Sequence, residues 1–197
     1  MMKKSFVVLF VVLCFLTGCG AKTVDRKETE NQSMEQTKTE TEKETAFPAT
    51  YTIPDGWVKS EEYSTNEKFF YIEEGNEDTT SSVPDNISIN IGKNRYSADE
   101  HPAFRDAIVQ QLLQQLDGVK ATLNGSGTFT EQGYPVYIFT ITENETDIVT
   151  QQYYIVDDYR YCLIHLTNYT GSESADEAAK TMVDSFIWAD ADETQKQ

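Results

Sequence analysis

The sequence predicts an α+β fold in which an antiparallel sheet of about six to seven strands is flanked by helices on both faces, in the chain order βββ-α-ββββ-α. Three observations support this prediction. Residues 86–91 alternate between apolar and polar side chains, as in a half-buried strand. Apolar residues recur at helical spacing over 102–117. Four strand-like segments then follow with short connections, and strands linked so closely run antiparallel.

Three strands are expected before the first helix. The first covers 49–53 and leads into Pro54-Asp55-Gly56, a turn sequence in which proline presets φ and glycine accepts a positive φ. Trp57 follows, and its side chain is expected to be buried in the core beside this turn. The second strand covers 68–73, and the third covers 86–91, whose three isoleucines share one face.

The first helix is expected to begin near Pro102 and to stop at Gly118. Its apolar positions form a stripe one face wide, as expected for a helix that packs on a sheet. The stripe consists of Phe104, Ile108, Leu112 and Leu116.

The next four strands are expected at 120–130, 134–142, 148–156 and 161–168. Gly133 can supply a positive φ in the first hairpin of this group. Bulky side chains occupy both faces of the last two strands, which predicts a sheet that is covered on both sides.

A second helix is expected to begin at a capping box formed by Ser174 and Glu177. Its buried side would carry Ala178, Met182 and Phe186. Trp188 closes the predicted domain.

The N-terminus has the layout of a signal peptide. Lys3 and Lys4 precede an apolar run from Phe6 to Leu16, which is too short to span a bilayer as a helix. The run ends in Leu16-Thr17-Gly18-Cys19, which resembles the lipobox of bacterial lipoproteins. The resemblance implies that the Cys19 sulfur carries a diacylglycerol and anchors the chain to a membrane. An ordinary secretory peptide with an incidental cysteine is the alternative.

Composition divides the chain into four parts. Residues 1–18 form the signal peptide, and residues 19–46 form a lipidated N-terminus and a polar tether with almost no apolar side chains. Residues 47–190 form one domain with enough apolar residues for a core. Residues 191–197 form a polar tail.

The net charge of −17 makes nucleic acid an implausible partner. Cys162 is the only cysteine after Cys19, so no disulfide is expected within the domain. Cys162 is expected to be a buried strand residue, and His165, three positions along the strand, would face the opposite side. This separation argues against a catalytic Cys–His pair.

We expect no cofactor and no dedicated metal site. The sequence contains only His101 and His165 as histidines, and nothing in the sequence brings them together. Acidic residues cluster at 73–78 and at Asp157-Asp158, where carboxylates could hold Ca²⁺ or could simply be solvated. The spacing matches no EF-hand loop.

Seven of the eleven tyrosines lie between 134 and 169. If the turn at 157–160 has a two-residue loop, Tyr154 faces Leu163, Val156 faces Tyr161 and Gln152 faces His165. Tyr154, Tyr161 and His165 are therefore the candidate partner-binding residues, provided that the second helix leaves this surface open. The alternative is that the rings only fill the interfaces between sheet and helix.

This arrangement resembles the PsbP-like fold, which is named for an extrinsic subunit of photosystem II and is shared by a yeast Ran-binding protein and many bacterial lipoproteins. The resemblance rests on Tyr51–Trp57, Asn86–Gly92, Tyr153–Val156 and Ala178–Trp188. It implies a non-enzymatic binding or assembly-supporting role at a membrane surface, and the fold brings no catalytic motif with it.

We therefore expect a lipid-anchored protein on the extracytoplasmic face of the cell membrane that binds or supports an envelope protein or an extracellular ligand and is not an enzyme. The alternative is a module that captures a metal or a small ligand with its acidic loops or its tyrosine-rich face.

Overall fold

The structure is a computed structural model that describes residues 48–76 and 83–189. The signal peptide, Cys19, the tether and the polar tail lie outside the described residues. So do the first and last residues of the expected domain.

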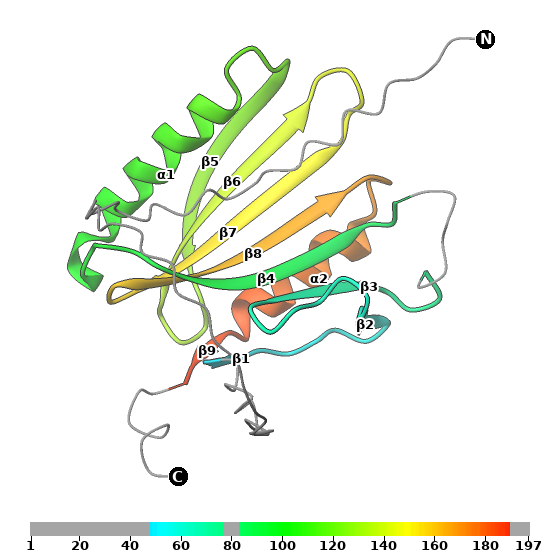
Figure 1. Cartoon of the computed structure of the whole chain (residues 1–197), viewed down its shortest axis with the longest axis horizontal. Helices are drawn as coiled ribbons and strands as arrows, with labels where there is room; N and C mark the ends of the chain where they lie inside the picture. The colour runs from blue at the N-terminus through cyan, green and yellow to red at the C-terminus, as the bar shows by residue number, and fades with distance from the viewer. Residues whose placement is uncertain (1–47, 77–82, 190–197) are drawn as a thin grey trace, which may run out of the picture. The chain divides into compact units, whose positions relative to one another are not determined.

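Seven strands form one antiparallel sheet (Figure 1). In space their order is β2-β3-β4-β8-β7-β6-β5, and each neighbouring pair is antiparallel. The strands are β2 (Trp57–Lys59), β3 (Lys68–Glu73), β4 (Asn86–Lys93), β5 (Ala121–Phe129), β6 (Pro135–Glu143), β7 (Val149–Asp157) and β8 (Arg160–Asn168). The expected α+β class and the meander of the last four strands are confirmed.

Two further strands pair outside this sheet. They are β1 (Ala49–Thr50) and β9 (Ile187–Trp188), with Ala49 opposite Trp188. The strand predicted over 49–53 is therefore wrong in length and in partner, because the chain leaves the pairing before Ile53 and Pro54 turns it. Trp57, which is 5% exposed, enters the core as expected but does so as the first residue of a strand.

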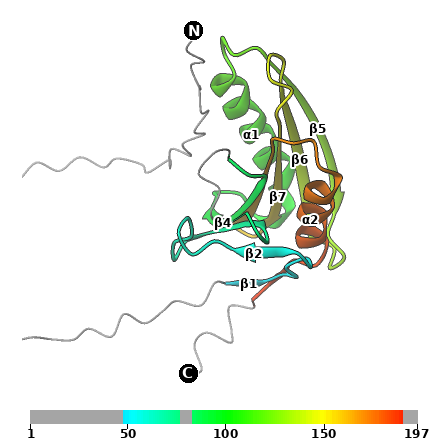
Figure 2. The same ribbon diagram turned by 90° about the vertical axis from the view of Figure 1, so that its right-hand side faces the viewer.

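Helices α1 (His101–Gln115) and α2 (Glu173–Asp184) lie on opposite faces of the sheet (Figure 2). A short 3₁₀ turn, η1 (Ala98–Glu100), leads into α1. Phe104, Ile108 and Leu112 are buried as predicted, whereas Leu116 caps the helix. Gly118 follows with φ of 77°.

The capping box predicted at Ser174 is wrong. Helix α2 begins at Glu173, with Ser172 as its N-cap, two residues before the predicted cap. The Asn168 side chain causes this early start, because its Oδ1 accepts hydrogen bonds from the amides of Gly171 and Ser172 at 2.7 and 3.0 Å. The capping box of this fold instead precedes η1, where the Ser97 amide donates to Oε2 of Glu100 at 3.1 Å.

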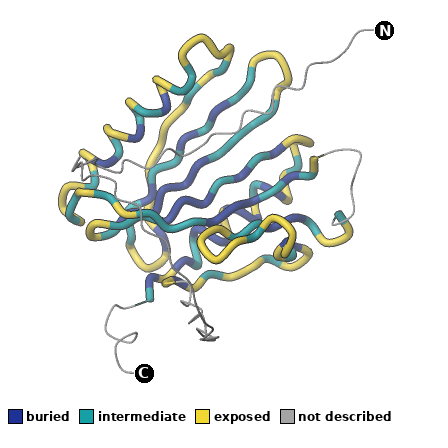
Figure 3. Tube along the Cα trace, viewed as in Figure 1, coloured by how far each residue is buried: buried dark blue, intermediate teal, exposed yellow. Residues whose placement is uncertain are grey.

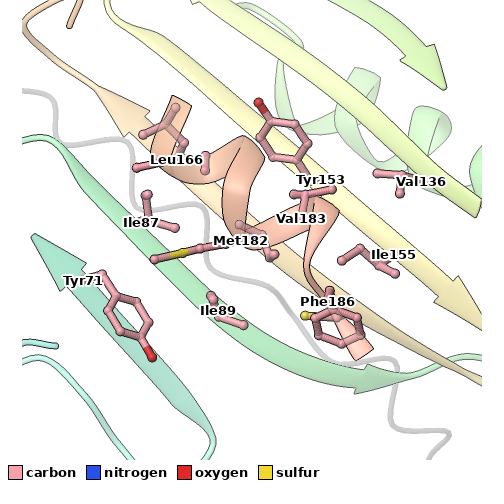
Figure 4. Packing of buried hydrophobic residues seen from close by; sticks show 14 of the residues in the cluster. Tyr71, Ile87, Ile89, Val136, Tyr153, Ile155, Leu166, Met182, Val183 and Phe186 are labelled. Atoms are coloured by element: carbon pink, nitrogen blue, oxygen red, sulfur yellow. The ribbon is translucent and has the colours of Figure 1, made fainter. Parts of the chain in front are cut away.

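The main core lies between α2 and the sheet (Figure 4). Met182 is fully buried there in one cluster with the isoleucines of β4, as its spacing predicted. Phe186 is also fully buried, but it follows the helix, which ends at Asp184, and is not part of it as expected. Cys162 and Ile155 belong to the same layer. Burying an aliphatic or aromatic side chain contributes about 1.5–3 kcal/mol, so this layer supplies much of the driving force for folding.

Candidate functional site

The other face of the sheet, which α1 partly covers, carries three polar side chains in one row. Ser88 of β4 lies opposite His165 of β8, and His165 lies opposite Gln152 of β7. Ser88 and Gln152 are only 4% and 1% exposed, and His165 is half-buried. We call Ser88, His165 and Gln152 the polar row. Ser88 and Gln152 are thus buried polar side chains, which normally have hydrogen-bond partners.

Gln152 is held by one end of its amide. The hydroxyl of Tyr154 donates a hydrogen bond to Gln152 Oε1 at 3.0 Å. The amide nitrogen Nε2 is then left buried with no hydrogen-bond partner among the described residues. An unpaired buried donor costs about 1–3 kcal/mol, so this nitrogen is the clearest sign of an unused binding capacity on the face.

His165 is neutral at pH 7. Burial, and to a smaller extent the positive charge of Lys68, lower its pKa to about 4. Lys68 comes from β3, where it faces Asn90 of β4, and Asn90 in turn faces Leu163 of β8. Desolvation also lowers the pKa of Lys68, whose Nζ lies 4.6 Å from the ring centroid of Phe70. In the part of the chain that the structure describes, no carboxylate forms an ion pair with Lys68.

An aromatic cluster adjoins the polar row beneath α1. Phe104 projects from the helix onto Tyr154 and Tyr161, with ring centroids 5.8 and 5.3 Å apart. Phe139 of β6 lies against the Tyr154 ring at 5.9 Å. Burial raises the pKa of Tyr161 and of Tyr154, so both hydroxyls stay protonated at neutral pH.

The expected register of the tyrosine face is confirmed. Tyr154 faces Leu163, Val156 faces Tyr161, and Gln152 faces His165. The covering element differs from the expectation, however, because α1 packs on this face and α2 packs on the opposite one. Tyr154 is 1% exposed beneath α1, whereas Tyr161 and His165 are partly accessible. Partner binding by these residues stays a prediction.

Cys162 lies on the α2 face of β8, opposite His165, as predicted. The thiol is fully buried, and burial raises its pKa well above the ordinary value. A thiolate is the form that acts as a nucleophile, so this environment keeps Cys162 unreactive.

The carboxylates of the Asp157-Asp158 turn have structural roles. Asp157 accepts hydrogen bonds from Arg160 at 2.8 and 2.6 Å, and Asp158 accepts one from the Ala98 amide at 3.2 Å. Glu77 and Asp78 of the other loop lie outside the described residues. Within 48–76 and 83–189, no three His, Cys, Asp or Glu side chains converge on a point that could hold a metal ion.

A recess with a volume of about 370 Å³ lies beside the end of β3. Asp85 lines it, but this carboxylate already accepts hydrogen bonds from the amides of Tyr169 and Thr170 at 2.6 and 3.1 Å. The Asp85 carboxylate in this recess is therefore already engaged in hydrogen bonds within the protein. Of the helices in the described ranges, none is long and apolar enough to cross a bilayer.

Comparisons with known proteins bear on the fold alone. No family model matches the sequence, and no curated protein matches it. Among solved structures, the chain is similar to the solution structure of cyanobacterial PsbP (CyanoP) from Synechocystis sp. PCC 6803. The TM-score is 0.43 at 14% sequence identity, and the match covers 72% of this chain and 86% of that chain.

Sequence reasoning missed the members of the site that come from distant segments. Ser88 was recognisable only as a polar position in an alternating strand, which usually faces water. Lys68 reaches His165 across two intervening strand pairings, and no spacing in the sequence shows that proximity. Phe104 was assigned to a buried stripe, but its partners Tyr154 and Tyr161 depend on which face α1 covers.

Proposed function

We propose that this chain is a lipid-anchored protein on the extracytoplasmic side of the cell membrane, whose folded module binds or supports another envelope component without catalysing a reaction. The observation that carries the proposal is the sequence Leu16-Thr17-Gly18-Cys19 at the end of an apolar run preceded by lysines. A diacylated and N-acylated cysteine binds a membrane far more tightly than one acyl chain does.

Replacement of Cys19 by serine tests the anchor. Cells that express the full chain are labelled with an alkyne fatty acid and then separated into membrane and soluble fractions. We expect the wild-type chain to be labelled and to sediment with membranes, and the Cys19→Ser chain to lose the label. Cys14→Ser is the matched control because it removes a neighbouring cysteine within the apolar run and should leave labelling intact. Equal labelling of wild-type and Cys19→Ser chains would refute the anchor.

The binding role rests on the absence of an assembled catalytic group in the site. Among residues 48–76 and 83–189, neither His165, which lies beside Gln152, nor the buried Cys162 has a partner that would activate it. Affinity capture from membranes with the anchored wild-type chain should enrich a specific envelope protein. Recovery of the same proteins with an unrelated lipoprotein as bait would contradict this role.

The polar row favours capture of a small ligand as a second candidate function. Among the described residues Gln152 Nε2 is an unpaired donor, and the Lys68 ammonium, which forms no ion pair there, adds a positive charge on the same face. Such a set suits a ligand that accepts hydrogen bonds, such as a carboxylate. Calorimetric titration with acetate and succinate tests carboxylate binding, with Gln152→Met as the control. Titration with Ca²⁺ and Zn²⁺ tests metal binding. Absence of heat in all titrations would remove the candidate.

A further inference from the structure

The sheet has one protected edge and one open edge. Strand β2 at the first edge is only three residues long and ends in Lys59, which pairs with Glu61 at 3.3 Å. Strand β5 at the other edge is nine residues long, and its residues 124–129 are all exposed (Figure 3). Short strands and lysines are the usual means by which proteins keep sheet edges from pairing with other chains. β5 has neither.

β5 is also uncharged in a strongly charged chain. No residue from Ala121 to Thr130 carries a charge, although the chain has a net charge of −17. Residues 124–129 of this strand are exposed, so neither α1 nor another described element buries them. The edge is therefore accessible, and little charge repulsion acts at the edge itself.

Two hydrogen bonds identify which residues of β5 point outward. The Thr130 amide donates to the Tyr134 carbonyl at 3.0 Å, and the Asn144 amide donates to the Lys120 carbonyl at 2.9 Å. Both pairs continue the register in which Phe129 lies opposite Pro135. Residues that bond to the neighbouring strand alternate with residues that point away from it. Even-numbered residues of β5 therefore bond to β6, and odd-numbered residues point outward.

Four outward residues have free backbone groups. The amide of Ala121 is already used, because it donates to the Val119 carbonyl at 3.0 Å. The remaining outward residues have no backbone or side-chain partner beyond β6 among the residues that the structure describes. They are Leu123, Gly125, Gly127 and Phe129, and we call them the β5 edge.

We infer that the β5 edge pairs with the β5 edge of a second copy of this chain, antiparallel, about a two-fold axis at Ser126. In this register Leu123 faces Phe129 of the second copy, and Gly125 faces Gly127 of the second copy. All four free residues then exchange hydrogen bonds. A register centred on Gly125 would need the occupied amide of Ala121, and one centred on Gly127 would leave Leu123 unpaired.

The side chains are self-complementary in the same register. Phe129 is 64% exposed in the single chain, and pairing places it beside Leu123 of the second copy. Glycines flank the central pair of Ser126 residues, so the only side chains at the centre are small. The remaining charge of each copy opposes association over a longer range, which predicts that pairing strengthens as salt is added.

A cysteine at position 126 tests the register. In the inferred pair the two Ser126 residues face each other at a non-hydrogen-bonded position, where Cα atoms lie about 4.5 Å apart, within the range that a disulfide spans. Thr128 is exposed on the same side of the strand, but the two copies of Thr128 would be offset by roughly 13 Å. We expect oxidation to convert the full-length Ser126→Cys chain to a dimer on a non-reducing gel, with Thr128→Cys and wild type remaining monomeric.

A charge at the same position tests the pairing without forming a disulfide. Ser126→Lys places two ammonium groups directly opposite each other, whereas Thr128→Lys adds the same charge opposite Asn124. Dimers are trapped with a photo-crosslinking residue at position 124 that does not react with amines. The Ser126→Lys chain should lose the cross-linked dimer, and the Thr128→Lys chain should keep it. Equal cross-linking of the Ser126→Cys and Thr128→Cys chains, or a dimer that survives Ser126→Lys, would overturn the inference.

Discussion

The ring of Tyr161 lies across Gly92, which faces it from the neighbouring strand. A Cβ at residue 92 would lie 2.3 Å from Cζ of Tyr161. The ring cannot easily move aside, because Phe104 lies against it at 5.3 Å and Tyr154 at 5.7 Å between ring centroids. The glycine at this position is thus required by close packing, and the aromatic cluster beneath α1 depends on it.

Gly92→Ala is expected to destabilise the protein. The added methyl group must displace the Tyr161 ring into a packed cluster, and overpacking of this kind costs about 1–3 kcal/mol. Urea denaturation should show this loss in the free energy of unfolding. Gly127→Ala is the matched control, because its nearest contact is the Val136 carbonyl at 3.5 Å, an ordinary van der Waals distance. Equal stability of both variants would show that the ring has room to move.

Tyr154→Phe should destabilise the protein by about 1 kcal/mol or more, because it removes the hydrogen bond to Gln152 and leaves the whole buried amide without a partner. The double variant Tyr154→Phe/Gln152→Met removes both polar groups at nearly constant volume. We expect it to recover the lost stability, since replacing both partners by apolar groups is close to neutral. A double variant less stable than Tyr154→Phe alone would mean that Gln152 has a further stabilising partner, and denaturant titrations measure all three chains.

Alternation and periodicity were sufficient to predict much of the fold. The strand of Ile87 and Ile89, the stripe of Phe104 on α1 and the register of Tyr154 against Leu163 all follow from local patterns with a tight turn between β7 and β8. These features depend on neighbours in the sequence. The stripe of a helix shows that it packs on a sheet, but it does not show which face it covers, and this is why α1 rather than α2 was found above Tyr154.

The remaining features depend on contacts between distant segments. The pairing of Ala49 with Trp188 joins the two ends of the described chain, and the start of α2 is set by the Asn168 side chain rather than by the Ser174 motif. Lys68 and His165 come together only through the strand order β3-β4-β8. None of these contacts leaves a periodic pattern in the sequence.

Cys162 should be unreactive in the folded protein. Its thiol is fully buried, and burial raises its pKa, so both access and the thiolate fraction are low. Iodoacetamide followed by peptide mass spectrometry should find residue 162 unmodified in the native chain and modified after denaturation. The Thr128→Cys chain, which is expected to stay monomeric, supplies an exposed thiol in the same sample as a positive control. Native labelling of Cys162 as fast as that of residue 128 would contradict its burial.

His165 should make stability depend on pH. Its folded pKa of about 4 lies below the ordinary value of 6.5, so the unfolded chain takes up a proton first as the pH falls. The contribution of His165 to the free energy of unfolding is complete above about pH 6.5 and declines between 6.5 and 4, with a limiting slope of about 1.4 kcal/mol per pH unit.

Replacement of His165 by glutamine isolates this dependence from the carboxylates, which titrate in both chains. Urea denaturation at several values between pH 7 and pH 4 should give a steeper loss of unfolding free energy for wild type than for His165→Gln. His101→Gln is the matched control, because it removes the other histidine. His101 is the first residue of α1, and its Nδ1 lies 2.7 Å from the hydroxyl of Tyr137. Because the slope reports protons bound on unfolding, parallel curves for wild type and His165→Gln would show that the imidazole at position 165 is solvated and titrates alike in both states.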